Sequence, residues 1–124
     1  MKELTRAEEQ VMQILWKLEK AFVKDVVESF NEPKPAYNTV STIIRILEKK
    51  GFVSYEAFGK THQYYPLLKK EQYSKQQLGS IVTDYFEGSF TKMLSFFTSN
   101  KKLSLKEIEE AGKLLKKLKS NTKK

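Results

Sequence analysis

The sequence predicts a mostly α-helical protein, with three helices and a β-hairpin in residues 1–69 and further helices in residues 70–124. Apolar residues recur at intervals of three and four along most of the chain, which is typical of amphipathic helices. Residues 53–67 instead hold two runs of β-branched and aromatic residues around Gly59 and Lys60, which indicates a hairpin. A chain of 124 residues with 40% hydrophobic content can bury one modest core, or a small core plus a helical appendage.

The first three helices are expected within residues 1–50. An apolar stripe runs over residues 4–18, and Thr5 with Glu8 forms a capping box that fixes the start of this helix. A shorter helix is expected over 24–30, and the proline-containing stretch 31–36 ends it. Gly51 is placed to stop the third helix. The inward face of that helix should carry Val40, Ile43, Ile44 and Leu47.

The C-terminal third is expected to be entirely helical. Stripes over 78–86 and 90–97 are separated by Gly88, and Ser104 with Glu107 forms a capping box for a last helix. These stripes hold more apolar surface than so small a region can cover, so we expect a homodimer. The alternative is that the stripes pack back on residues 1–69. The expected dimerisation residues are Leu78, Ile81, Val82, Tyr85, Phe86, Phe90, Leu94, Phe97, Leu105, Ile108, Leu115 and Leu118.

The order of three helices and a hairpin is that of a winged helix-turn-helix, whose third helix enters the DNA major groove while the wing follows the backbone. The outward arc of the third helix carries hydroxyl, amide and cationic side chains and no acid. Arg45 could bind a guanine and Asn38 an adenine, whereas Lys34 and Lys60 would meet phosphates. The expected DNA-binding residues are Lys34, Tyr37, Asn38, Thr39, Ser41, Thr42, Arg45, Lys49, Lys60 and His62. The alternatives are an ordinary solvated helix face and, for Tyr37, a core or capping role.

Composition restricts the remaining classes of function. A net charge of +8 favours a polyanionic partner, either nucleic acid or an anionic membrane surface, although it could simply maintain solubility. The absence of cysteine excludes disulfides and thiolate chemistry. No signal peptide or membrane-spanning run is seen, so a soluble intracellular protein is expected. The lone His62 makes no zinc site, and no catalytic motif is present, so we expect neither an enzyme nor a cofactor.

Several short motifs, in their order and spacing, resemble the penicillinase-repressor family of bacterial winged-helix transcription regulators. The likeness covers nearly the whole chain. The first helix contributes an acid before an apolar run that ends in a tryptophan. The matching stretches are Leu4-Thr5 to Glu8, Val11 to Trp16, Thr39-Val40-Ser41-Thr42, Arg45, Leu47, Lys49-Lys50-Gly51-Phe52-Val53, Gly59-Lys60 and Tyr64-Tyr65-Pro66-Leu67.

The resemblance implies a cytoplasmic homodimer with a winged-helix DNA-binding domain (1–69) and a helical dimerisation domain (70–124), which represses genes by occupying inverted-repeat operators in double-stranded DNA. Copper-responsive members carry a cysteine metal motif, and the lack of cysteine excludes that mode of sensing. Antibiotic-responsive members are cut at an Asn-Phe bond by a membrane-bound sensor metalloprotease. No Asn precedes a Phe here, so release by such a protease would need another sequence preference.

Two other functions stay open. The chain could be a winged-helix repressor of another family, controlled by a small-molecule effector between its domains. It could also be a winged-helix protein-interaction module whose charge serves solubility.

Overall fold

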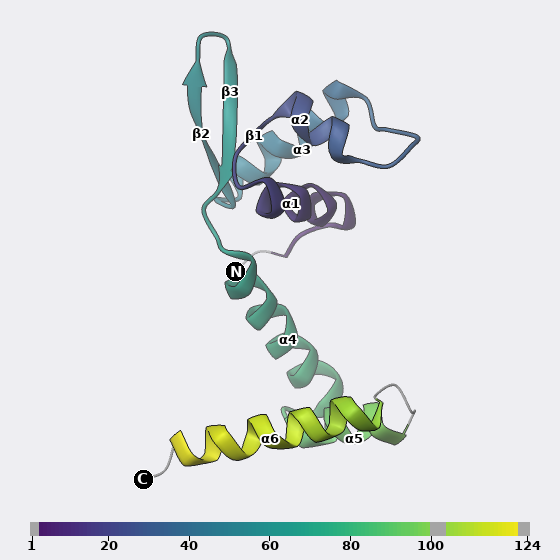
Figure 1. Ribbon diagram of the computed structural model, residues 1–124. Helices are drawn as coiled ribbons and strands as arrows, with labels where there is room; N and C mark the ends of the chain where they lie inside the picture. The colour runs from purple at the N-terminus through teal and green to yellow at the C-terminus, as the bar shows by residue number, and fades with distance from the viewer. Residues whose placement is uncertain (1–2, 100–103, 122–124) are drawn as a thin grey trace. The chain divides into compact units, whose positions relative to one another are not determined.

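The computed structural model describes residues 3–99 and 104–121, and its chain forms two compact units, Met1–Gln76 and Gln77–Lys124. Figure 1 shows the elements. In chain order these are α1 (Arg6–Leu18), β1 (Ala21–Phe22), α2 (Val23–Ser29), α3 (Tyr37–Lys49), β2 (Val53–Phe58), β3 (Thr61–Pro66), α4 (Lys70–Phe86), α5 (Phe90–Ser99) and α6 (Leu105–Asn121). The predicted fold class, a winged helix followed by further helices, is confirmed.

Side-chain caps fix the starts of α1 and α6 as predicted. The Glu8 amide donates to the Thr5 hydroxyl oxygen at 3.2 Å, while the Thr5 amide donates to the Glu8 carboxylate at 2.9 Å. Ser104 and Glu107 exchange the same pair of hydrogen bonds at 3.1 and 3.2 Å. Each reciprocal pair satisfies backbone donors that have no partner inside the helix.

The core of the first unit lies where three helical stripes meet the base of the hairpin. The stripe of α3 confirms the predicted inward face, although Ile43 is only half-buried. After α3, Gly51 adopts a φ of 85°, and the Phe52 amide donates back to the Leu47 carbonyl at 2.9 Å. A positive φ suits glycine because it has no Cβ, so Gly51 ends the helix as expected. The most deeply buried side chains are Met12, Leu15, Ile44, Leu47, Val11, Val26, Val40 and Val53.

The hairpin belongs to a three-stranded antiparallel sheet of order β1-β3-β2, and β1 is a strand that the sequence pattern did not predict. β2 and β3 pair from Val53 opposite Pro66 to Phe58 opposite Thr61, and Gly59 turns between them with a φ of 64°. β1 adds only Ala21 and Phe22. Two residues are too few to show the alternation that predicts a strand. Past its short pairing with β1, the β2–β3 hairpin projects as the wing (Figure 1).

Helix α4, which leads into the second unit, begins before the predicted apolar stripe. α4 begins at Lys70, eight residues before the first predicted apolar position, Leu78. Tyr73 on its first turn is buried against the first unit, with its ring centroid 5.8 Å from that of Trp16 and 6.0 Å from that of Phe52. The compact units therefore divide at Gln76 and Gln77, seven residues after the boundary expected at residue 69.

Candidate nucleic-acid interface

The outward face of α3 is exposed and free of acids along its centre. The helix buries Val40, Ile44 and Leu47 against the core, and this fixes which residues face solvent. The exposed residues opposite that stripe are Asn38, Thr42, Arg45 and Lys49, and Thr39 is exposed on one flank. Helical spacing therefore assembles amide, hydroxyl and cationic groups on one surface, as the sequence predicted.

A hollow of about 480 Å³ lies between α3 and the wing, and we call it the wing hollow. It brings together five of the predicted DNA-binding residues from two elements that are distant in sequence. From α3 come Tyr37, Ser41 and Arg45, and from the wing come Lys60 and His62. Tyr37 is 54% exposed, which rules out the alternative core role for it. Asn38, Thr39, Thr42, Lys49 and Lys34 do not line this hollow.

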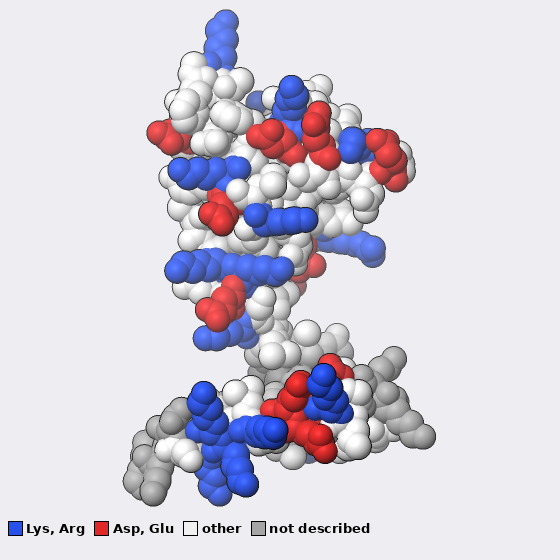
Figure 2. Space-filling view, in the orientation of Figure 1, with Lys and Arg blue, Asp and Glu red and all other residues white. Residues whose placement is uncertain are grey.

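The wing presents one exposed cation, Lys60, and one stacked imidazole, His62. Lys60 is exposed in the turn, which the Thr61 hydroxyl closes by donating to the Phe58 carbonyl at 2.9 Å. Figure 2 shows a basic side chain projecting from the tip of the hairpin. His62 is half-buried and stacks on Tyr55, with ring centroids 4.0 Å apart and an interplanar angle of 6°. This stacking fixes the ring plane, so His62 meets a ligand in one orientation.

Lys34 is engaged within the chain. Its ammonium group donates to the carbonyl oxygens of Glu28 and Phe30 at 3.1 and 2.9 Å, and it lies 3.9 Å from the Glu32 carboxylate. Cations near the last carbonyls of a helix offset the negative end of its dipole, so Lys34 stabilises the end of α2. A phosphate contact would have to compete with these hydrogen bonds.

Eight residues that line the wing hollow were not predicted: Phe22, Val23, Lys24, Asp25, Glu48, Tyr55, Thr61 and Tyr64. Glu48 follows Arg45 by three positions and Ser41 by seven, so helical spacing could have placed it on the flank of α3 that faces the wing, beside the acid-free centre of the outward face. Burial, followed by the nearby charge of Glu48, raises the pKa of the Tyr64 hydroxyl, while Arg45 opposes the shift. No sequence signal marks Lys24, because only the packing of α2 against β3 brings it near the wing.

The predicted dimerisation residues lie on α4, α5 and α6. Phe86 packs against Phe96 with ring centroids 5.7 Å apart. Val82, Phe86 and Leu94 are half-buried. The remaining predicted residues, all exposed in the single chain, are Leu78, Ile81, Tyr85, Phe90, Phe97, Leu105, Ile108, Leu115 and Leu118.

In the described part of the chain, no three histidine, aspartate or glutamate side chains group so that they could hold a metal ion. Within residues 3–99 and 104–121, no helix is long and apolar enough to cross a membrane.

Three helices packed on a small sheet, with a polar face of α3 beside a projecting β2–β3 hairpin, define a winged helix-turn-helix protein. The model of the penicillinase repressor family matches residues 4–117. The chain therefore belongs to the penicillinase repressor family, as its motifs suggested, and it is a transcriptional repressor.

Two relatives illustrate the similarity. The chain is 29% identical over 116 residues to the methicillin resistance regulatory protein MecI of Staphylococcus aureus strain N315, covering 93% of this chain and 94% of that protein. It is 25% identical over 122 residues to the penicillinase repressor of Bacillus licheniformis, covering 98% and 95%. Among solved structures, it is similar to one titled "CopR Repressor Structure", at 30% identity and a TM-score of 0.45, over 55% of this chain and all of that one.

Proposed function

We propose that the chain is a homodimeric, sequence-specific repressor that occupies an inverted-repeat operator, with α3 in the major groove and the β2–β3 wing along the backbone. The observation that carries this proposal is the exposed, acid-free face of α3 beside the wing lysine. Its members are Asn38, Thr42, Arg45 and Lys49 on α3 and Lys60 in the turn.

Each of these side chains suits one kind of DNA contact. The Arg45 guanidinium can donate two hydrogen bonds to guanine O6 and N7, whereas the Asn38 amide can donate one to adenine N7 and accept one from adenine N6. Each such pair contributes about 1–3 kcal/mol of discrimination between bases. Thr42 can contact a thymine methyl group, whereas Lys49 and Lys60 can neutralise phosphates.

The charges that line the wing hollow influence where the DNA backbone can lie. Glu48 and Asp25 line the hollow together with Lys24, Arg45 and Lys60. The Asp25 carboxylate accepts from the Phe22 amide at 2.9 Å at the start of α2. The two carboxylates partly offset these three cations, so we expect the DNA backbone to follow the rim of the hollow, where Lys60 is exposed.

A symmetric operator requires a symmetric protein. The exposed apolar residues of α4, α5 and α6 supply a surface that a second copy can bury. Two winged helices held together in this way would read two half-sites, and the repeat between the half-sites would mirror the two-fold axis of the dimer.

The experiment that tests the proposal is selection of bound duplexes from a random DNA pool with the full chain. The winning duplex is then titrated against a scrambled duplex at two salt concentrations. We expect an inverted repeat, bound at least about 10³-fold more tightly than the scramble. Absence of enrichment, with only weak salt-sensitive binding, would reject sequence-specific repression and favour the protein-interaction module.

We infer that release from DNA by a sensor protease would involve α5, where Phe96 and Phe97 are 52% and 38% exposed. The residues that precede them are Ser95 and Phe96, so the protease would not recognise an Asn-Phe bond. Co-expression with a sensor encoded beside this gene, followed by immunoblotting after induction, tests this inference. A repressor that stays intact while its target gene is induced would contradict it.

A further inference from the structure

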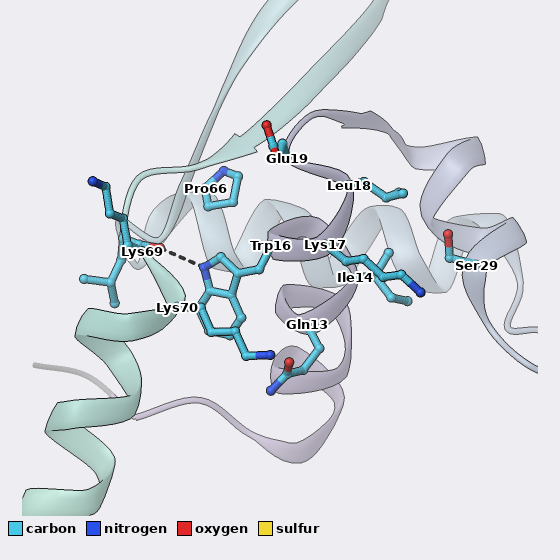
Figure 3. A pocket seen from close by; sticks show the side chains of 11 residues that line it. Gln13, Ile14, Trp16, Lys17, Leu18, Glu19, Ser29, Pro66, Lys69 and Lys70 are labelled. Atoms are coloured by element: carbon cyan, nitrogen blue, oxygen red, sulfur yellow. Dashed lines mark hydrogen bonds between the residues drawn. The ribbon is translucent and has the colours of Figure 1, made fainter. Parts of the chain in front are cut away.

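A second hollow, of about 980 Å³, lies in the first unit between the outer side of α1, the end of α2 and residues 66–70 (Figure 3). We call it the α1 pocket. It shares no lining residue with the wing hollow, so the proposed DNA contacts leave it free. Its volume falls within the range of about 300–1,000 Å³ that small-molecule sites occupy.

The walls of the α1 pocket are apolar around a central aromatic ring. The Trp16 indole N–H donates to the Leu68 carbonyl at 2.8 Å, so its hydrogen-bonding requirement is met within the chain. The ring therefore offers the pocket an apolar surface. Pro66 lies on one side of the ring, and Ile14 and Leu18 extend the surface along α1 (Figure 3). Leu18 is 38% exposed, which leaves apolar area that a ligand could cover.

The rim of the α1 pocket is cationic. Lys17, Lys69 and Lys70 line it, against one acid, Glu19. Among the described residues, none of these three ammonium groups forms an ion pair or donates a hydrogen bond. Figure 3 shows the Lys70 side chain passing beside the Trp16 ring, whereas Lys69 points away from it. Unpaired cations beside an apolar hollow are complementary to an anion that carries an apolar body.

We propose that the α1 pocket binds a small amphipathic carboxylate. Its hydrocarbon body covers Trp16, Ile14 and Leu18, and its carboxylate pairs with Lys70 or Lys17. Burying the body removes apolar surface from water, and the charge-assisted hydrogen bond orients the molecule. The proposal does not depend on the proposed DNA-binding function.

Occupancy of this pocket would link segments that are distant in sequence. The ligand would contact α1 and also residues 66–70, which connect the wing to the start of α4. A ligand that binds only the folded chain stabilises it in proportion to its concentration and affinity. We therefore expect binding to raise the unfolding temperature of the chain.

Trp16 is the only tryptophan of the sequence, so all tryptophan fluorescence of the chain comes from a residue that lines this pocket. The probe is 4-cyclohexylbutanoate, which does not absorb where tryptophan is excited. Its neutral counterpart is 4-cyclohexylbutan-1-ol. We expect a saturable change in Trp16 fluorescence with the carboxylate, and binding of the alcohol about tenfold weaker. No saturable change up to millimolar carboxylate, or equal affinity for the two molecules, would overturn the proposal.

Variants of the full chain separate the proposed cations from general surface charge. The Lys17→Gln, Lys70→Gln double variant should bind the carboxylate about tenfold more weakly and the alcohol as before. Lys75→Gln is the matched control, because Lys75 is exposed on α4 but does not line the pocket. Since the substituted lysines are exposed, unfolding temperatures without ligand should match the original. A double variant that binds the carboxylate as tightly as the control would reject the assignment.

Discussion

Arg45 and Lys60 lie on the two elements of the proposed DNA interface, and their side chains can recognise different features of a duplex. We predict that Arg45→Ala weakens binding to the selected operator by about 1–3 kcal/mol per half-site and leaves scrambled DNA nearly unaffected. Lys60→Ala should weaken binding to both duplexes and reduce the salt dependence by about one counterion per subunit. Titrations of both duplexes at several salt concentrations measure these effects.

Lys75→Ala is the control for this pair, because it removes the same charge from an exposed position on α4. It should change neither affinity beyond a small electrostatic effect. If Arg45→Ala and Lys60→Ala behaved alike, the assignment of α3 to the groove and of the wing to the backbone would be wrong.

Glu8 and Lys50 form an ion pair that joins the start of α1 to the end of α3. The Lys50 ammonium donates to the Glu8 carboxylate at 2.7 Å, and the two side chains are 23% and 7% exposed. Burial by itself raises the pKa of Glu8, but the hydrogen bonds from Lys50 and Thr5 and the charge of Lys50 outweigh it. The pKa therefore lies below its ordinary value of 4.5.

A carboxyl group whose pKa is lower in the folded state stabilises that state above the unfolded pKa, and the contribution disappears as pH falls through the folded pKa. We predict that Glu8→Gln lowers the free energy of unfolding by about 1–2 kcal/mol at pH 7. The difference from the original chain should shrink steadily below about pH 4.5. Urea titrations between pH 3 and 7 measure it.

Glu87→Gln is the matched control, because Glu87 pairs with Lys92 at 2.6 Å while 80% of its side chain is exposed. Water screens such a pair, so its loss should change stability little. A pH-independent difference between Glu8→Gln and the original chain would contradict the stabilising role of the charged carboxylate.

At the scale of elements, the first turn of α4 is anchored by Tyr73. Its ring is 4% exposed and packs between Trp16 and Phe52. Its hydroxyl is buried towards the Leu4 backbone, without a well-formed hydrogen bond among the described residues. The ring, rather than the hydroxyl, therefore holds α4 to the first unit.

We predict that Tyr73→Ala lowers the free energy of unfolding of the first unit by about 3 kcal/mol, because it removes a buried ring and leaves a cavity. Tyr73→Phe keeps the ring and should stay within about 1 kcal/mol of the original chain. Thermal unfolding followed by Trp16 fluorescence reports on this contact directly. A large loss for Tyr73→Phe would show that the hydroxyl has a partner that stabilises it.

At the scale of the whole molecule, charge and apolar surface act together. Two copies carry +16, twice the +8 of one chain, so a dimer should bind DNA with a steeper salt dependence than a monomer. The apolar residues of α4, α5 and α6 would supply the interface. Operator affinity should therefore depend on residues outside the first unit.

We predict that the chain is dimeric at micromolar concentration by light scattering, and that Ile81→Glu shifts it towards monomer. The substitution places a charge on exposed apolar surface, where burial in an interface would leave the charge unpaired. Thr83→Glu is the control, since Thr83 is exposed on another face of α4. A monomeric original chain, or equal effects of the two substitutions, would contradict this interface.

The sequence alone determined which parts of the chain are mainly helical, the side-chain caps of α1 and α6, and the face that α3 presents to solvent. These features depend on residues three or four positions apart, so the local pattern that places Val40, Ile44 and Leu47 inside also places Asn38, Thr42 and Arg45 outside. The hairpin was predictable for a similar reason, because its two strands directly flank the turn at Gly59. The class of protein followed from the order of these elements.

Only the tertiary structure decided which distant segments meet. The pairing of β1 with β3 has two registered positions, and the burial of Tyr73 depends on Trp16 and Phe52. The wing hollow with Glu48 and the α1 pocket around Trp16 likewise join residues from separate elements. Long-range packing brings together the residues that meet at these places. Such packing has no fixed spacing in the chain, so no periodicity of the sequence predicts it.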